Sequence, residues 1–343
     1  MKVGAAVRSR VSRVAVPLAW LLLGVVLLAP LTQADEARNL GIPSLVDRAQ
    51  LRILTTIAMF VVMASAWNII GGIAGYASFG NVGFFGLGAY TTAMLVDRDR
   101  GGLPFAVGLL AAPILPMLFA AGIGSVLLRL RGHYFAIATL GASIAVGEVI
   151  KNIDYLGGST GLFPPILPKA DLVFFYLMAA VAALTVGTNW LILRSRFGYG
   201  LMAIRENEHA AAVIGVDTTR YKVRAFITAA ALTGLAGGVF AQWTSFVSQD
   251  NVFPISYNVE MILMAVIGGA GTVLGPVIGA VGLEALIQVL AGGGSGAAAT
   301  QVGLGILLAV TVVFLPRGVV DFFGGRSKLS LRAIRASLRE TSA

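Results

Sequence analysis

Three glutamates and one asparagine are the residues of this chain best placed to do chemistry, because they lie inside or at the edge of long apolar runs. They are Asn68, Glu148, Glu260 and Glu284. A polar or ionisable group is costly in an apolar run of membrane-spanning length, and it commonly marks a solute pathway, a proton relay or a gate. Pairing is an alternative, because Glu148 lies three residues before Lys151 and Glu260 lies close to the predicted outer surface. We therefore treat all four as candidates for a pathway or its gate.

Most enzymatic chemistry is excluded by the residue types present. The 343 residues include no cysteine and two histidines, which excludes thiol catalysis and a cysteine or histidine-rich metal centre. The sequence has no Gly-x-x-x-x-Gly-Lys-Ser/Thr loop, so we expect no ATP site of that kind and no cofactor on this chain. No nucleophile and base stand in a recognisable pattern. We predict a protein that is not an enzyme and draws its energy from a partner or an ion gradient.

The composition places the candidate residues in a membrane. Apolar residues make up 57% of the chain and charged residues 12%, which is about half the charged fraction of a soluble domain. Apolar runs of about twenty residues recur, each long enough to cross a bilayer as a helix. The net charge of +9 lies in short loops and at both ends without interleaved aromatic residues, so we expect no nucleic-acid binding. The predicted fold class is an all-α polytopic membrane protein.

About ten transmembrane helices account for the apolar runs. The runs cover residues 14–31, 53–72, 79–96, 103–128, 134–150, 172–193, 225–246, a glycine-rich pair from 259 to about 290, and 298–315. The first run follows basic residues as a signal peptide does, but its length favours a retained helix. If the glycine-rich pair is one span and a re-entrant segment, the count becomes nine.

The basic residues sort the loops between two sides of the membrane. With the N-terminus inside and ten spans, segments 1–13, 129–133, 194–224 and 316–343 share one side and hold 18 of the 25 Lys and Arg residues. Such an excess marks the cytoplasmic side, so we predict that both termini are cytoplasmic. Residues 14–315 then form the membrane domain. The basic tail either anchors the topology or lies on anionic membrane lipid as an amphipathic helix.

Two glycine-rich stretches with a similar order of residues interrupt the apolar runs, one over residues 69–82 and one over 266–277. Their glycines are Gly71, Gly72, Gly75 and Gly80, and then Gly268, Gly269, Gly271 and Gly275. Paired interruptions at membrane depth are typical of discontinuous helices that line a transport pathway. Close packing of helices through small residues is the alternative, and both can hold for one segment.

The longest polar stretch between spans is the insert 194–224. Residues 201–214 favour a helix, which Gly215 would end, and Asp217 can cap the helix that follows. We predict that the insert projects from the cytoplasmic face. An amphipathic loop lying on lipid headgroups is the alternative reading of its positive charge.

The insert carries the motif Phe-Gly-x-x-Leu-x-Ala-Ile-Arg-Glu-Asn-Glu from Phe197 to Glu208, followed by an Ala-Ala pair and Ile-Gly-Val. This order of residues resembles that of the LivM-type permeases, the membrane subunits of branched-chain amino-acid ABC importers. The resemblance continues over about 250 residues in segments 68–90, 130–141, 157–162, 225–238, 264–279 and 314–318.

This resemblance implies a permease of a bacterial inner membrane that imports branched-chain amino acids by alternating access. The implied partners are a homologous second permease, two ABC ATPases that hold ATP and magnesium, and a periplasmic binding protein. The implied coupling residues are Arg205, Glu206, Asn207, Glu208, Ala210, Ala211 and Gly215. The usual pattern Glu-Ala-Ala-x-x-x-Gly has His209 in place of its glutamate here, which leaves open which acid meets the ATPase. Import of urea or short amides, and ion-coupled secondary transport through Glu148 or Glu284, are the alternatives.

Overall fold

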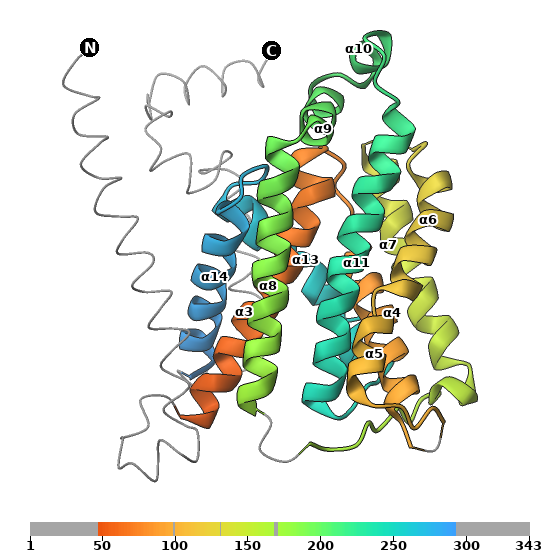
Figure 1. The fold of residues 1–343 in the computed structure, drawn as a ribbon, viewed down its shortest axis with the longest axis vertical. Coiled ribbons are helices and arrows are strands. Elements are labelled where there is room, and N and C mark those ends of the chain that lie inside the picture. Colours follow the sequence, from red (N-terminus) through yellow and green to blue (C-terminus); the bar gives the residue numbers. More distant parts are fainter. Residues whose placement is uncertain (1–46, 99, 131, 168–170, 293–343) are drawn as a thin grey trace, which may run out of the picture.

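The computed structural model describes residues 47–98, 100–130, 132–167 and 171–292, which form a bundle of helices (Figure 1). The elements are α3 (Arg48–Asn68), η2 (Ile69–Ile73), α4 (Asn81–Val96), α5 (Phe105–Ala111), α6 (Ile114–Leu127), α7 (His133–Lys151), η3 (Asp154–Leu156), α8 (Asp171–Arg194), α9 (Arg196–Glu206), α10 (Glu208–Val213), α11 (Thr218–Thr244), α12 (Gln249–Val252), α13 (Ile255–Gly268) and α14 (Gly275–Gly292). Within these residues the β-structure is limited to one bridge between Leu162 and Val247. The described part of the fold is therefore all-α, as predicted.

Each apolar run that falls within the described residues forms a helix or a pair of helices. Six segments are long and apolar enough to cross a membrane, and α4 and the start of α14 are shorter apolar helices. The run 103–128 is divided into α5 and α6 at Pro113, whose missing N–H and ring interrupt a helix. The glycine-rich pair forms two helices, α13 and α14. The runs 14–31 and 298–315, the segment 1–13 and the tail lie outside the described residues, so ten spans and cytoplasmic termini stay predictions.

Small residues allow the central helices to approach closely. α11 packs along α4, and a Cβ at Gly88 would overlap the backbone of Gly234 on α11. In the same way, a Cβ at Gly237 would overlap the Phe85 carbonyl on α4. Membrane helices associate through such close backbone contacts because lipid tails supply no hydrophobic force between them.

The loops of the bundle collect at two ends. At the end that carries α9 and α10, Lys222 Nζ donates to the Leu128 carbonyl at 2.9 Å. At the opposite end Arg100 Nε donates to the Tyr155 carbonyl at 3.0 Å. The loops predicted to be cytoplasmic, 129–133 and 194–224, therefore share one end, which we call the α9–α10 end. This arrangement agrees with the sorting by charge.

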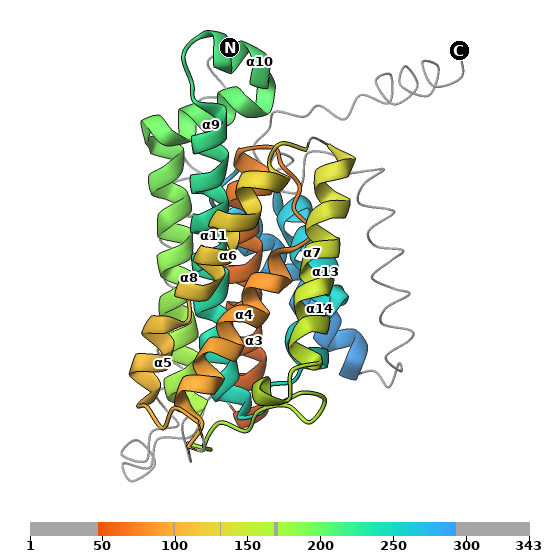
Figure 2. The ribbon, with the colours of Figure 1, turned by 90° about the vertical axis from the view of Figure 1, so that its right-hand side faces the viewer.

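Two helices begin inside the bundle rather than at either end. α4 has 16 residues and follows a non-helical segment from Ala74 to Gly80, so it starts part-way down the bundle (Figure 2). α13 has 14 residues, and its first turns lie beside the start of α4, because Asn258 Oδ1 accepts from the Val82 N–H; together with α12 it makes up the apolar segment Gln249–Gly268. At 1.5 Å per residue neither helix reaches across a hydrocarbon core of about 30 Å. The first glycine-rich segment is thus a discontinuity of the kind the sequence predicts.

Candidate translocation and coupling site

Asn68 joins the two glycine-rich segments. Its side chain is fully buried near the end of α3. Asn68 Oδ1 accepts from the backbone N–H of Gly271 at 2.7 Å, and Nδ2 donates to the Thr272 carbonyl at 2.9 Å. Nδ2 also lies 3.1 Å from Oδ1 of Asn189 on α8. One carboxamide therefore satisfies backbone groups that the loop between α13 and α14 leaves without helical partners.

The glycines serve both close packing and backbone freedom. A Cβ at Gly72 would overlap Asn68 Oδ1, and one at Gly71 would overlap the Trp67 ring. A Cβ at Gly268 would overlap the Gly275 carbonyl, so these two glycines let α13 and α14 meet where they turn. Gly271 has φ 83° in the loop between them, a backbone conformation that favours glycine. Close packing through small residues is therefore confirmed in both stretches, and their role in lining a transport pathway stays a prediction.

The remaining predicted glycines lie in the non-helical segment before α4 and in the loop between α13 and α14. Gly75 has φ 78° and Gly269 has φ 125°. Gly80 precedes α4, and a Cβ there would overlap the Thr139 carbonyl on α7.

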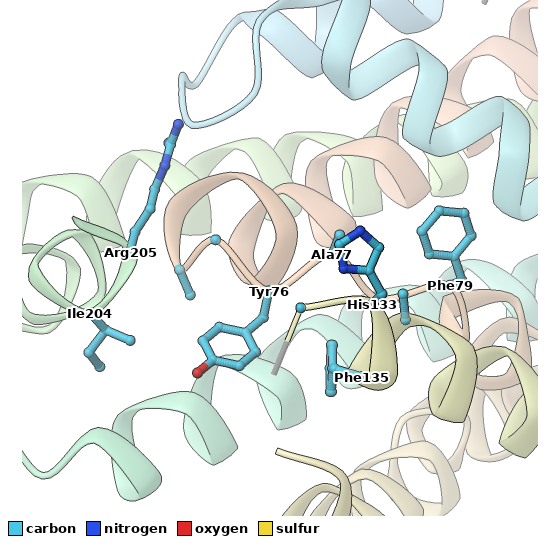
Figure 3. A pocket seen from close by; sticks show the side chains of 11 residues that line it. Tyr76, Ala77, Phe79, His133, Phe135, Ile204 and Arg205 are labelled. Carbon is cyan, nitrogen blue, oxygen red and sulfur yellow. The ribbon is translucent and has the colours of Figure 1, made fainter. Parts of the chain in front are cut away.

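Arg205 connects the insert to both glycine-rich segments. It lies in the last turn of α9, and its Nη1 donates to the Gly72 carbonyl at 2.6 Å. A Cβ at Gly271 would lie 2.6 Å from the same Nη1, and one at Gly75 would lie 2.8 Å from Arg205 Cγ. Figure 3 shows the side chain extending from α9 toward the loop that precedes α14. The Arg205 guanidinium group therefore lies against both glycine-rich segments, at Gly72 and at Gly271.

The insert forms two short helices, so the prediction of a single helix over 201–214 is wrong. α9 ends at Glu206 and α10 runs from Glu208 to Val213. Asn207 separates them in an extended conformation, and its Oδ1 accepts from the Ala210 N–H at 3.1 Å. An asparagine cap stabilises a new helix start and thus competes with continuation of the old one. The predicted cap at Asp217 is confirmed, because its Oδ1 accepts from the Arg220 N–H.

Glu208 lies against the bundle rather than facing away from it. Glu208 Oε1 lies 2.6 Å from Lys222 Nζ, and the Tyr76 hydroxyl donates to Oε2 at 2.6 Å. The Lys222 side chain is 4% exposed and that of Glu208 is 15% exposed. Lys222 belongs to α11 and Tyr76 to the segment before α4, so this cluster fastens α10 to two parts of the bundle. The acid predicted as a coupling residue is thus a bridge between elements.

The outward surface of α10 is mostly apolar, although it includes the exposed side chain of His209. Val213 and Ile214 are 87% and 75% exposed. Ala210 and Gly215 are exposed beside them, whereas Ala211 is buried against the rest of the insert. The predicted coupling residues therefore divide between exposed positions, which include Glu206 and Asn207, and inward-facing ones.

A cavity of about 470 Å³ opens at the α9–α10 end beside these contacts. The segment before α4 lines it with Tyr76 and Phe79, α7 with His133 and Phe135, and α9 with Arg205 (Figure 3). Phe79 stands two residues before the start of α4, so the cavity reaches from the insert toward that helix.

The three predicted glutamates do not join this site. Glu284 is buried on α14 and accepts from Gln288 Nε2 at 2.8 Å. Glu260 is half-buried on α13 and lies within electrostatic reach of Glu284. Glu148 is exposed on α7, near the end opposite α9 and α10. Among the described residues, no group of three His, Asp or Glu could hold a metal ion.

Several functional candidates were missed in the sequence. Asn81 and Asn189 are buried amides inside apolar runs, and Asn258 is a buried amide at the edge of one, which is the same signal that selected Asn68. Lys222 is a cation near the start of a span, and Tyr76 lies within the first glycine-rich stretch. Residues inside or at the edge of an apolar run include the three asparagines, whereas Lys222 lies three residues before the run 225–246 and Tyr76 lies between two runs.

Comparison with known proteins identifies the family. A model of the permease component of branched-chain amino acid transport systems matches residues 50–315. The chain is 27% identical to the high-affinity branched-chain amino acid transport system permease protein LivM of Salmonella typhimurium, over 84% of this chain and 73% of that protein. It is 22% identical to LivH of Escherichia coli K12, over 64% of this chain and 78% of that protein.

A permease named for a different solute is also similar to this chain. The autoinducer 2 import system permease protein LsrC of Yersinia pestis is 27% identical over 60% of this chain and 59% of that protein. No solved structure matches the chain. Since the family model covers most of the sequence, including both glycine-rich segments and the insert, this chain belongs to the family of branched-chain amino acid transport system permease components.

Proposed function

We propose that this chain is one of two permease subunits of an ATP-driven importer that moves branched-chain amino acids across a bacterial inner membrane. LivM and LivH relatives carry the names of permeases for these solutes, and the presence of both in Escherichia coli K12 supports a pair of homologous permeases. The remaining partners are two ATPases that bind ATP and magnesium, and a periplasmic binding protein that delivers the solute. This chain itself binds no cofactor.

The observation that carries the proposal is the path of contact from α10 to the discontinuous helices. The apolar surface at Val213 and Ile214 offers a docking site for an ATPase. Glu208 and Lys222 fasten α10 to α11, and Arg205 fastens α9 to Gly72. Movement of the ATPases on binding ATP would displace α9 and α10, and with them the two glycine-rich segments.

Discontinuous segments suit alternating access. Their backbone groups are satisfied by side chains such as Asn68 rather than by a continuous helix, so exchange of a few hydrogen bonds changes their arrangement. Such a change transports solute only if the two arrangements open to opposite sides of the membrane. The cavity at the α9–α10 end is the candidate opening on the cytoplasmic side.

Reconstitution tests this function. The complete complex in proteoliposomes, with the binding protein outside and ATP inside, should accumulate labelled L-leucine. A matched complex whose ATPases cannot hydrolyse ATP is the control. Uptake that survives this loss but collapses when an ionophore removes the ion gradient would refute ATP coupling. Excess unlabelled isoleucine or valine should compete, and competition by urea or acetamide alone would refute the solute class.

A further inference from the structure

Two buried asparagines meet where α4 and α13 begin. Asn258 Oδ1, in the first turns of α13, accepts from the Val82 N–H of α4 at 3.1 Å. The other end of this carboxamide, Nδ2, has no hydrogen-bond partner among the described residues. Asn81 Nδ2 and Oδ1 also lack a hydrogen-bond partner among the residues that the structure describes. Asn81 is fully buried and Asn258 is 1% exposed.

Unpaired amides at such depth call for a ligand. A buried polar group without a partner loses its hydration and gains nothing in return, so native proteins rarely retain it. Here three such atoms occur on two side chains that are adjacent through the Val82 contact. Together they offer two donor groups and one acceptor to a small polar solute.

The start of α4 gives this position a positive character. The first backbone N–H groups of a helix lack intrahelical partners and form the positive end of its dipole. Gly80 is the residue before α4, and it supplies no side-chain cap. A larger residue would collide there, because a Cβ at Gly80 would overlap the Thr139 carbonyl. The N-cap residue therefore supplies no side-chain competitor for an anion, and among the described residues the one side chain that already accepts from the first turn of α4 is Asn258, through the Val82 N–H.

Polar atoms continue from this position toward the end opposite α9 and α10. The Tyr90 hydroxyl, further along α4, and Gln249 Oε1 on α12 are also buried without a partner in the described residues. The Tyr90 ring lies 6.1 Å from that of Phe253, which also fills the space over Gly86. On the other side, Phe79 lines the cavity at the α9–α10 end (Figure 3). The start of α4 thus lies between a cavity and a series of unpaired polar groups.

We propose that the N-terminus of α4, with the carboxamides of Asn81 and Asn258, binds the carboxylate of an amino acid as it passes through the membrane. The identity of the solute, an amino acid, rests on the function proposed above. Helix dipole and amide N–H groups attract the carboxylate, and Asn81 Oδ1 can accept from the ammonium group. The aromatic rings along α4 provide an apolar surface for an aliphatic side chain.

Asn81→Asp separates this role from a structural one. Aspartate has almost the same shape, and a negative charge in the first turn of a helix is favourable. A solute carboxylate is instead repelled. Because position 81 is fully buried, uptake is compared only once the variant complex unfolds in SDS like the parent, which excludes a loss of fold. In the reconstituted importer we expect L-leucine uptake to fall roughly tenfold or more, the factor expected when a hydrogen bond to a charged group is lost. Asn152→Asp adds the same charge at an exposed carboxamide near the end of α7 and should leave uptake unchanged.

A second measurement does not depend on transport. Because the chain has no cysteine, Asn258→Cys creates a single thiol in this subunit. Ala89→Cys, fully buried against α11, is the matched control. In the assembled complex cycled with ATP, Asn258→Cys should react several times faster with an anionic sulfonate thiosulfonate reagent than with its trimethylammonium analogue. L-Leucine delivered by the binding protein should slow that reaction.

The outcomes are separable. A parent complex that imports no L-leucine refutes the proposed function and leaves the thiol measurement to decide whether an anion reaches this position. Normal L-leucine uptake by the Asn81→Asp complex overturns the carboxylate site. So does a thiol at position 258 that does not react faster than the Ala89→Cys control in any nucleotide state. Equal reactivity toward the two reagents, after each rate is divided by the rate of the same reagent with a free thiol in solution, overturns its positive character.

Discussion

Removal of the Glu208 carboxylate should destabilise the whole chain, because it leaves the Lys222 ammonium buried without its counter-charge. The two groups lie 2.6 Å apart, and the lysine side chain is 4% exposed. Loss of one partner of a buried pair costs about 3–5 kcal/mol. Lys222 Nζ retains the Leu128 carbonyl and the Tyr76 hydroxyl at 2.9 and 3.2 Å, so we expect the lower end, about 3 kcal/mol, for Glu208→Ala.

Unfolding by SDS titration in mixed micelles measures this free energy. Lys222→Met removes the buried charge, so Glu208→Ala with Lys222→Met should be more stable than Glu208→Ala alone, by roughly 1–3 kcal/mol. Glu206→Ala is the matched control, since that side chain is exposed two residues away. If Glu208→Ala unfolds like the parent and only loses its ATPase, the carboxylate is a docking group and the buried-pair argument is refuted.

Three further variants test the connections at the α9–α10 end. Gly72→Ala should lower stability by about 1–3 kcal/mol in the same titration, since its Cβ would overlap the fixed Asn68 carboxamide, and an unchanged value would mean that the loop yields freely. Arg205→Lys keeps the charge but loses the guanidinium geometry toward Gly72, so leucine imported per ATP hydrolysed should fall severalfold in proteoliposomes while ATP hydrolysis continues; an unchanged ratio would contradict this link. Val213→Ser with Ile214→Ser should leave unfolding unchanged and weaken copurification of the ATPases, whereas full copurification would exclude α10 as the docking site.

The helices of the described region were predictable because membrane crossing imposes a strong pattern. An apolar run of about twenty residues can form all of its backbone hydrogen bonds within itself only as a helix, so helices could be predicted for runs such as 53–72 and 172–193. Boundaries were less predictable where the chain departs from a simple crossing. The run 103–128 contains Pro113, and this residue marks the division between α5 and α6 that hydropathy alone does not show.

The insert shows a failure of propensity. Alanines at 210–212 favour a continuous helix, yet Asn207 ends one helix and caps the next. The sequence contains a possible signal for the break, because asparagine is a common N-cap and Asn207 can accept from the Ala210 N–H. The same residues, however, also fit an uninterrupted helix. The choice is decided by tertiary contacts, because the break directs Glu208 to Lys222, which stands 14 positions further along the chain.

The sequence allowed several residues of the site to be selected, but it did not predict which of them contact one another. Asn68 and the glycines could be selected because amides and small residues are unusual in apolar runs, but their partners lie far away: Asn68 bonds to Gly271, 203 residues later. No local pattern encodes such a distance. The structure shows why the first segment needs glycine at position 72. A Cβ there would overlap both the Asn68 carboxamide and the backbone nitrogen of Gly271 in the second segment. The same crowding brings Arg205 to both segments, so the close packing that stabilises this region also connects it to the insert.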